Sequence, residues 1–391
     1  MANNHSHDES PIVLLVDNLL QQAVLRGASD IHCESTLNGL KIRERLDGVL
    51  YDGQTIDLQT ASQILARIKV LAHIDSSQKR IPQDGKFCAP INGHEIDFRV
   101  STFPSIHGEK IVIRILDRSN QAIAIEQLGF TQTMLADIKD LISKSSGFFL
   151  VSGPTGSGKT TTLYAILSSL NSPQKNIITL EDPVEYNVAG ITQGQIHPEA
   201  GFTFEKGMRA LLRQDPNIIM IGEIRDKQSA QIAIEASLTG HVVLSTVHTN
   251  DASSVIMRLM DMGIEPFLIN AALTGMLAQR LARTICSECK IHYSPTTDEQ
   301  QFISKHNLAI TKLYKGTGCP ACLRTGYKGR TGVFELVHMT PSLRNLVSEK
   351  PIFDDVIAQA RHDGSKSMLH DGAYKVQEGI ITLAELIRAV S

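Results

Sequence analysis

Residues 150–163, LVSGPTGSGKTTTL, place a glycine-rich loop between an apolar run and a segment that favours a helix. Further apolar runs at 176–180, 217–222 and 241–247 alternate with helical stretches. This alternation predicts a parallel sheet that helices cover on both faces. Because ligands of such sheets collect at the carboxyl ends of the strands, the polar residues that follow each run are the candidate site.

The glycine-rich loop matches the phosphate-binding pattern G-x-x-x-x-G-K-[ST], which predicts a site for ATP and Mg²⁺. Backbone N–H groups of the loop and of the following helix can surround the phosphates. Lys159 adds positive charge near the β and γ positions, and the Thr160 hydroxyl can bind Mg²⁺. The alternative, a chance glycine-rich turn, does not account for the strand before the loop and the helix after it. The residues predicted to bind the nucleotide are Gly153, Pro154, Thr155, Gly156, Ser157, Gly158, Lys159, Thr160 and Thr161.

Three side chains that follow the other apolar runs are candidates for catalysis. Glu223 follows Gly222, which occupies the position where ATPases with this loop usually carry an aspartate, and we expect Glu223 to polarise the attacking water. The alternative for Glu223 is simple pairing with Arg225. Glu181 is a candidate for Mg²⁺ or water contact, against the alternative of a solvated loop carboxylate. His248 is a candidate sensor of the γ-phosphate, against the alternative of a packed histidine.

The pattern changes along the chain predict the domain organisation. Residues 1–9 are polar and are expected to form a disordered tail. Residues 10–117 begin with a capped, proline-initiated helix, continue with short strand-like runs between Asp-Gly and Asn-Gly turns, and predict a small α+β domain. Residues 118–127 are a predicted linker, and 128–391 a second domain that includes a cysteine-containing subdomain at 284–335.

Four of the six cysteines form two CxxC pairs, Cys286/Cys289 and Cys319/Cys322. Two such pairs suit a tetrahedral, structural Zn²⁺ site with four thiolates and no open position for chemistry. The segment between the pairs is longer than in compact zinc ribbons, so we expect a projecting loop. Chance pairs or a redox centre are the alternatives. The solitary Cys33 and Cys88 have no assigned role.

Taken together, these segments resemble the type II secretion and type IV pilus assembly ATPase family. The resemblance rests on SGPTGSGKTTTLY, ITLEDPVEY, LLRQDPNIIMIGEIRD and GHVVLSTVHTNDA, and extends to ASDIHCE, RIPQDGK, CSECK and DGAYKVQEGIITLAEL in the same order. It implies an α/β fold, with a RecA-like P-loop motor domain, a smaller N-terminal α+β (PAS-like) domain and a zinc-binding tetracysteine insertion.

The resemblance also implies a mode of action. Members of this family are homohexamers that bind ATP between their two domains and act on an inner-membrane platform protein, which adds or moves pilin-like subunits. Matching positions imply that Arg99 in FRVST and Arg114 in VIRIL reach the γ-phosphate, where guanidinium groups stabilise developing charge. The alternative is that both arginines only carry charge on exposed strand faces.

Bulk composition bears on location. The longest apolar runs are too short to cross a bilayer, and the start, MANNHSHDES, lacks the layout of a secretory signal. We therefore expect a cytoplasmic protein that is peripheral at the inner membrane through its partners. Many secretion members carry a further N-terminal domain, whereas this chain has little ahead of residue 11, so the docking partner and the choice among secretion, pilus and competence systems stay open.

Three other functions compete with an assembly motor. The net charge of −3 and the lack of a basic, aromatic stretch weigh against a nucleic-acid translocase. The paired cysteines weigh against a pilus retraction motor, since those relatives generally lack them. Glu223 and the two candidate arginines weigh against a non-hydrolytic scaffold or nucleotide switch.

Overall fold

The computed structural model describes residues 10–117 and 123–390, which form two compact units separated at residues 121 and 122. The predicted tail, 1–9, and the first part of the predicted linker, 118–122, lie outside the described residues. The rest of that predicted linker belongs to the second unit, because a 3₁₀ turn at Ile125–Gln127 buries the Ile125 side chain in its core. The units are called unit 1 and unit 2 below.

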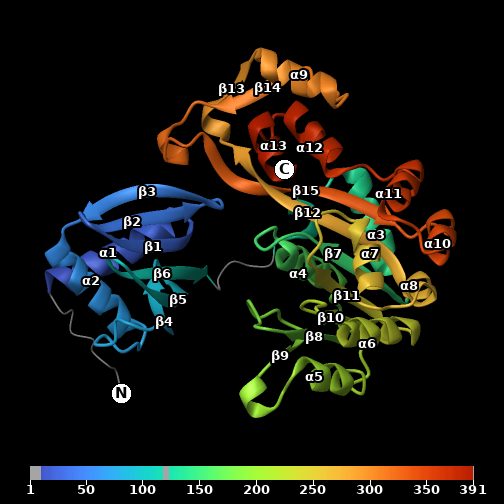
Figure 1. Cartoon of the computed structure of the whole chain (residues 1–391), viewed down its shortest axis with the longest axis horizontal. Helices are drawn as coiled ribbons and strands as arrows, with labels where there is room; N and C mark the ends of the chain where they lie inside the picture. Colours follow the sequence, from blue (N-terminus) through green and yellow to red (C-terminus); the bar gives the residue numbers. More distant parts are fainter. Residues whose placement is uncertain (1–9, 118–122, 391) are drawn as a thin grey trace. The chain divides into compact units, whose positions relative to one another are not determined.

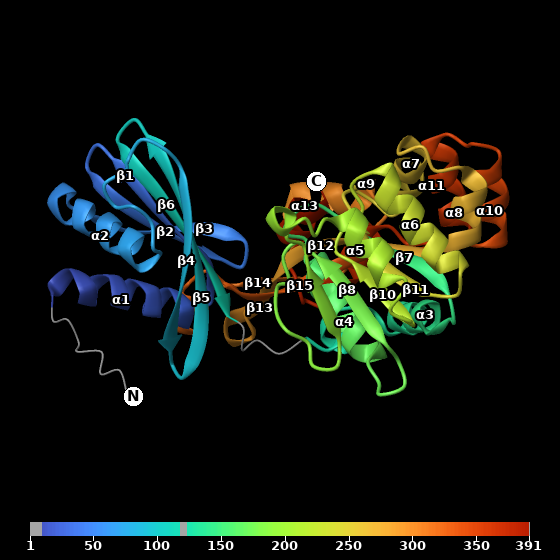
Figure 2. The same ribbon diagram turned by 90° about the horizontal axis from the view of Figure 1, so that it is seen from below.

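Unit 1 is an antiparallel six-stranded sheet in the order β3-β2-β1-β6-β5-β4. Both of its helices pack on the same face (Figure 2). This is the α+β arrangement expected for residues 10–117. Its elements are α1 (Pro11–Leu25), β1 (Ala28–Thr36), β2 (Gly39–Leu46), β3 (Val49–Ile56), α2 (Leu58–Leu71), β4 (Gln83–Ile91), β5 (His94–Ser105) and β6 (Gly108–Asp117).

The two faces of the unit 1 sheet differ because its strands alternate. In β5 the side chains of Ile96, Phe98 and Val100 are buried beneath the helices. The alternate residues Arg99 and Ser101 lie on the opposite face and are exposed. The fold therefore places Arg99 on a polar sheet surface that neither α1 nor α2 covers.

Unit 2 is built on a seven-stranded sheet in the order β15-β12-β7-β11-β10-β8-β9, parallel except for β15 (Figure 1). The apolar runs of the sequence form β7, β8, β10 and β11, as predicted. The elements that complete unit 2 are α3 (Gln132–Ser143), β7 (Gly147–Ser152), α4 (Lys159–Leu170), β8 (Ile177–Glu181), β9 (Thr192–Gln195), α5 (Phe204–Leu211), β10 (Ile218–Ile221), α6 (Lys227–Leu238), β11 (Val242–Val247), α7 (Ser254–Asp261), α8 (Pro266–Ala272), β12 (Leu273–Ile285), β13 (Lys290–Tyr293), α9 (Thr297–Lys305), β14 (Leu313–Gly316), β15 (Tyr327–His338), α10 (Pro341–Ser348), α11 (Phe353–His362), α12 (Met368–Gln377) and α13 (Leu383–Val390).

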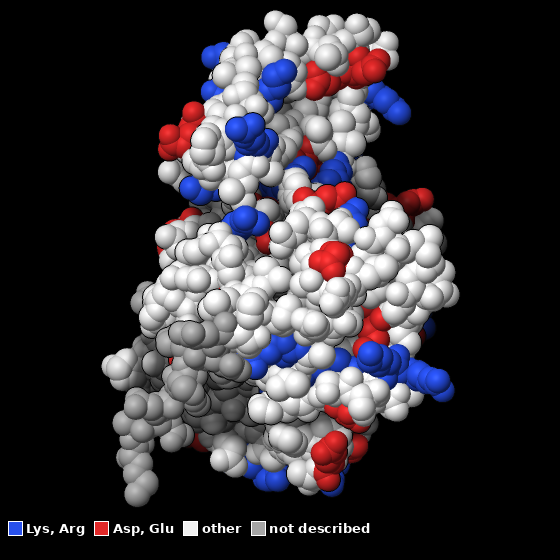
Figure 3. All heavy atoms as spheres, turned by 90° about the vertical axis from the view of Figure 1, so that its left-hand side faces the viewer, with Lys and Arg blue, Asp and Glu red and all other residues white. Residues whose placement is uncertain are grey.

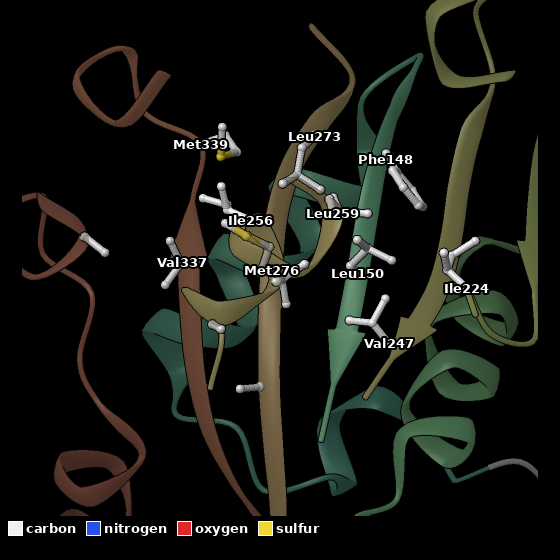
Figure 4. Packing of buried hydrophobic residues seen from close by; sticks show 14 of the residues in the cluster. Phe148, Leu150, Ile224, Val247, Ile256, Leu259, Leu273, Met276, Val337 and Met339 are labelled. Carbon is white, nitrogen blue, oxygen red and sulfur yellow. The ribbon is translucent and has the colours of Figure 1, made fainter. Parts of the chain in front are cut away.

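Strand β7 is buried on both faces, which explains its continuous apolar run. Phe148 and Leu150 belong to one core cluster, whereas Phe149 and Val151 belong to the other. Figure 4 shows one of these layers, in which Leu150 and other side chains of adjacent strands lie side by side. The sheet is thus the middle layer of unit 2, with helices on both sides, as expected for a covered parallel sheet.

The segment between the cysteine pairs is an ordered excursion. It leaves at the end of β12, forms the antiparallel ribbon β13–β14 with α9 between the two strands, and returns to β15. The amide of Gln377 in α12 accepts hydrogen bonds from the backbone of Thr311 (2.7 Å) and Lys312 (3.3 Å), which fixes the excursion to the C-terminal helices. The expected projecting loop is therefore a small folded module (Figure 1).

Unit 1 contains a buried ion pair between α2 and β6. The Lys69 ammonium donates to Glu109 Oε1 at 2.7 Å and to the Gln78 carbonyl at 2.5 Å. The two side chains are 1% and 5% exposed, so neither charge is hydrated. Removing one partner of such a pair leaves an uncompensated buried charge.

We predict that Lys69→Met lowers the stability of unit 1 by about 3 kcal/mol, because Glu109 loses its partner. Lys41→Met, which removes an exposed pair with Asp52, is the control and should cost less than about 1 kcal/mol. Native-state hydrogen exchange of the full chain, measured on peptides from 94–117, reports both opening free energies. Equal values for the two variants would contradict the buried pair as a stabilising contact.

Candidate functional site

The glycine-rich loop follows β7 and leads directly into α4, which begins at Lys159. Gly153 and Gly158 have φ of +145° and +87°, a backbone conformation that L side chains rarely adopt. A Cβ on Gly153 would lie 2.5 Å from the Gln279 carbonyl oxygen, and one on Gly158 would lie 2.8 Å from Gln279 Nε2. Both glycines are therefore required by conformation and by the close approach of β12.

The Lys159 ammonium lies inside the curve of the loop. It donates to the carbonyls of Gly153 at 2.8 Å and Pro154 at 3.1 Å. Burial lowers the pKa of Lys159, and the nearby Glu223 carboxylate opposes that shift. The loop thus holds a cation at the point where the predicted phosphates would bind.

Several groups in and after the loop are available to a ligand. The Ser157 hydroxyl is buried and has no hydrogen-bond partner among the described residues. Thr160, in the first turn of α4, is exposed, and Thr161 is half-buried. The exposed backbone of the loop comprises Pro154, Thr155 and Gly156. A nucleotide at this loop would therefore meet backbone donors, the hydroxyls of Ser157, Thr160 and Thr161, and one ammonium.

The carboxyl ends of β7, β11, β10 and β8 meet at one edge of the sheet, because these strands are parallel and adjacent. The segment after β10 is fixed to β11 by two hydrogen bonds of 2.8 Å, from the Ile224 N–H to the Thr246 carbonyl and from the Thr246 hydroxyl to the Gly222 carbonyl. Glu223 lies between these two contacts. It is consequently held at the same sheet edge as the loop.

Glu223 pairs with two basic side chains. Its Oε2 lies 3.2 Å from His248 Nε2, and its Oε1 accepts a hydrogen bond from Arg225. Burial opposes ionisation of Glu223, but the hydrogen bond and charge of Arg225, together with His248, lower its pKa overall. The structure therefore brings Glu223 and His248 together, and it also contains the Arg225 pairing that was the alternative to catalysis.

Glu181 lies at the end of β8 but is not solvated. Its side chain is 3% exposed and accepts hydrogen bonds from Tyr164 Oη (2.5 Å), Thr179 Oγ1 (2.5 Å) and Gln193 Nε2 (3.3 Å). Burial, with the hydrogen bond to Glu181, raises the pKa of Tyr164, so the phenol stays a donor. Because Tyr164 belongs to α4, Glu181 ties β8 to the helix that follows the loop.

Arg99 and Arg114 lie in unit 1, on the polar face of its sheet. They are cross-strand neighbours, and Lys86 of β4 lies directly opposite Arg99. The three side chains line a hollow of about 570 Å³, together with Asp84, Gly85, Val100, Ser101 and Val112. Arg114 donates to Asp30 Oδ1 at 3.0 Å. Lys86 was not among the residues predicted for the site. The register of the antiparallel strands places it beside Arg99.

The four paired cysteines converge in unit 2. Their sulfur atoms all lie within 4.8 Å of one another, and three of the separations are 3.7, 3.8 and 3.9 Å. A tetrahedral zinc site with metal–sulfur bonds of about 2.3 Å has sulfur–sulfur edges of about 3.8 Å. The donor set therefore fits Zn²⁺ in number, type and spacing.

Backbone N–H groups donate to two sulfur atoms of the cluster. The N–H groups of Gly318 and Gly326 donate to the sulfurs of Cys289 and Cys322, each at 3.3 Å. Although burial opposes ionisation, hydrogen bonds from the backbone of Cys319 and Gly326, with those of the Cys319 and Cys289 side chains, lower the pKa of Cys322 to about 6. Thiolates are the form that a metal requires.

The surface and helices add two observations. None of the helices in 10–117 and 123–390 is both long and apolar enough to cross a bilayer. On the face shown in Figure 3, acidic and basic side chains are interspersed. This agrees with the small net charge of the sequence, −3.

Comparison with known proteins bears out the resemblance in the motifs. Residues 5–388 match the family described as "Type II/IV secretion system protein". The type II secretion system ATPase E of Vibrio cholerae is 44% identical over 383 residues, which cover 98% of this chain and 76% of that protein. The type IV pilus assembly ATPase PilB of Thermus thermophilus is 42% identical, over 97% of this chain and 43% of that protein.

The mixed α/β fold is also found in a solved relative. The X-ray structure of the Legionella pneumophila ATPase DotB matches with a TM-score of 0.71 over 96% of this chain and 95% of that chain. At 20% identity, this match shows a shared fold. The matches in sequence go further: the chain belongs to the type II/IV secretion system protein family.

Proposed function

We propose that this protein is an ATPase that hydrolyses ATP with Mg²⁺ at residues 153–161 and uses the energy to assemble or move pilin-like subunits in type II secretion or type IV pilus biogenesis. The observation that carries the proposal is the buried Lys159 ammonium inside a glycine loop, near an anionic Glu223 from another strand end. Relatives named as a secretion ATPase and a pilus assembly ATPase support the coupling to these systems.

The residues at the loop suggest how binding proceeds. The phosphate oxygens replace the Gly153 and Pro154 carbonyls as partners of the Lys159 ammonium, and the loop N–H groups complete their coordination. The Thr160 hydroxyl would hold Mg²⁺ in part, and the ion would supply positive charge to the phosphates. Thr160 is exposed, so its hydroxyl is accessible to a metal ion.

Hydrolysis then requires Glu223 to change partners. A carboxylate that is held by Arg225 and His248 is a weak base, so we propose that Arg225 turns toward the phosphates and Glu223 orients the water. We propose that His248, through its contact with Glu223, responds to the presence of the γ-phosphate. For buried Glu181, we propose contact with the Mg²⁺ shell, which requires Tyr164 or Thr179 to release one oxygen.

Unit 1 supplies the remaining proposed phosphate contacts. We propose that Arg99 and Arg114 stabilise charge on the γ-phosphate, and the adjacent Lys86 makes that face more strongly cationic. The proposed assembly is a homohexamer that is cytoplasmic and peripheral at the inner membrane, where a platform protein and pilin-like subunits are its partners. The names of two relatives, a type II secretion system ATPase and a type IV pilus assembly ATPase, support partners within machinery of these two kinds.

For the tetracysteine cluster we propose a structural Zn²⁺ held by Cys286, Cys289, Cys319 and Cys322. The metal would supply four bonds that close the base of the β13–α9–β14 excursion. Four thiolates would fill the tetrahedral coordination of Zn²⁺ and leave no open position, so we propose no chemistry at this site.

We predict that Lys159→Ala weakens ATP binding about tenfold to a hundredfold, because charge-assisted hydrogen bonds to phosphate are lost. Titration with a fluorescent ATP analogue measures the change. The control is Lys139→Ala, which removes an exposed lysine of α3 that pairs with Glu126. Its affinity for the ATP analogue should equal that of the parent. Parent-like affinity of Lys159→Ala would contradict the assignment of the loop.

Glu223→Gln should bind ATP normally but release phosphate about 10² to 10⁴ times more slowly, because the amide cannot act as a base. The matched control is Glu235→Gln on α6, an exposed residue whose carboxylate accepts from Gln231. Phosphate release is measured at saturating ATP. Turnover at the parent rate would remove Glu223 from the mechanism, and absence of turnover in the parent would favour a nucleotide switch.

Replacing Cys286 and Cys289 together by serine should abolish zinc content in elemental analysis and increase hydrogen exchange in residues 284–335. The metal is expected to stabilise this segment strongly, since structural zinc contributes directly to folding. Cys88→Ser, in exposed β4, is the control. An unchanged ratio of zinc to protein in the double variant would refute the site.

The competing nucleic-acid translocase makes a different prediction. Such a protein would hydrolyse ATP faster with DNA, and the effect would fall steeply with salt. The assembly motor should be insensitive to added DNA. Phosphate-release assays with and without DNA at two salt concentrations separate the two functions.

A further inference from the structure

Gln279 of β12 lies directly behind the glycine-rich loop. Strand β12 pairs in parallel with β7, and Ala278 is opposite Ser152, the last residue of β7. The next residue, Gln279, therefore lies at the level where β7 ends and the loop begins. Its side chain is polar but only 2% exposed.

Both ends of the Gln279 amide are used. Nε2 donates to the Ser157 carbonyl at 2.8 Å, and Oε1 accepts from the Thr162 hydroxyl at 2.7 Å. A carbonyl can only accept, so the Ser157 contact fixes which end of the amide is the NH₂ group. One side chain thus connects the last part of the loop to the first turn of α4.

The contact with Ser157 sets the direction of a peptide group. In a trans peptide the N–H points away from the C=O. Because the Ser157 carbonyl points at Gln279, the N–H of Gly158 points to the opposite side of the loop. Gly158 precedes Lys159, so this N–H is one of the donors at the start of α4 that a phosphate would use.

A purely structural role would be satisfied by packing alone. The neighbours of Gln279 in β12 include Met276, Leu277 and Ala278, all fully buried and apolar. An aliphatic residue would suit such a strand, whereas a buried amide must find partners at a cost in desolvation. The partners that Gln279 finds are the loop and the helix that follows it.

We propose that Gln279 is a positioning residue for nucleotide binding, which holds the Ser157–Gly158 peptide with its N–H toward the phosphates. This inference rests on the proposed function of the loop as a nucleotide site. Gln279 acts through the loop and does not itself contact the nucleotide.

The test compares Gln279→Met, which keeps length but loses both hydrogen bonds, with Thr162→Val, which removes only the group that orients the amide. We expect the Kd for ADP to rise about tenfold in Gln279→Met and about threefold in Thr162→Val. The double variant should resemble Gln279→Met, because both changes act through one amide. The KM for ATP should rise in parallel, with kcat within about twofold of the parent, as for lost uniform binding.

Gln377→Met is the matched control. It removes an amide that contacts Thr311 and Lys312 in the same unit, so it reports the cost of losing a structural glutamine. Its Kd for ADP should equal that of the parent. Thermal unfolding and zinc content of every variant are measured alongside binding.

The outcomes distinguish failure of the proposed nucleotide site from failure of the positioning role of Gln279. If the parent binds no ADP, the proposed function fails before Gln279 is tested. If the parent binds and folded Gln279→Met binds equally well, the positioning role is wrong. A fall in kcat at constant KM, or additive effects in the double variant, would equally overturn it. Should Gln279→Met fail to fold, parent-like affinity of Thr162→Val would overturn the inference and a threefold loss would support it.

Discussion

The backbone ladder that joins β12, β7, β11 and β10 in parallel determines where the glycine-rich loop, Glu223 and His248 lie. Parallel pairing brings the carboxyl ends of four strands to one edge, and burial of β7 on both faces holds its last residue, Ser152, in a fixed place. The loop that follows inherits this position. Glu223 and His248 reach the same edge only because their strands share that ladder.

The charged groups Lys159, Glu223 and Glu181 at this edge are engaged with protein partners. Lys159 donates to carbonyls of its own loop, Glu223 is held by Arg225, and Glu181 by Tyr164. A ligand must therefore compete for these groups, since each already has a favourable contact. Binding of a phosphate would therefore replace some of these protein contacts. The loss of such contacts could shift the loop or helix that they hold.

Local patterns were sufficient to predict much of this structure. The continuous apolar runs predicted the buried strands, and glycine spacing predicted the loop, because both depend on residues that are adjacent in sequence. Each CxxC pair is also local, and the preference of zinc for four thiolates predicted that the two pairs meet. The excursion between the cysteine pairs was expected as a loop, because α9 and its two short strands have few apolar residues to reveal them.

Contacts between distant segments could not be predicted in this way. Gln279 meets Ser157 across more than a hundred residues, and nothing in AQRLART distinguishes a buried amide from a surface one. Lys86 lies beside Arg99 only through strand register, and Glu181 is buried only because α4 presents Tyr164. Each of these depends on the tertiary arrangement, which local periodicity does not contain.

Strand β12 has one more property, which follows from its length. It continues from Gln279 to Ile285, with a shift in its register against β15 between Arg283 and Ile285, and the next residue is the first cysteine of the cluster. Because side chains of a strand alternate, an inserted or deleted residue in this stretch would turn the sulfur ligand to the opposite face of the sheet. The number of residues between Gln279 and Cys286 is therefore constrained. An insertion in the excursion beyond Cys289, by contrast, would leave the stretch from Gln279 to Cys286 unchanged and would not reach the loop.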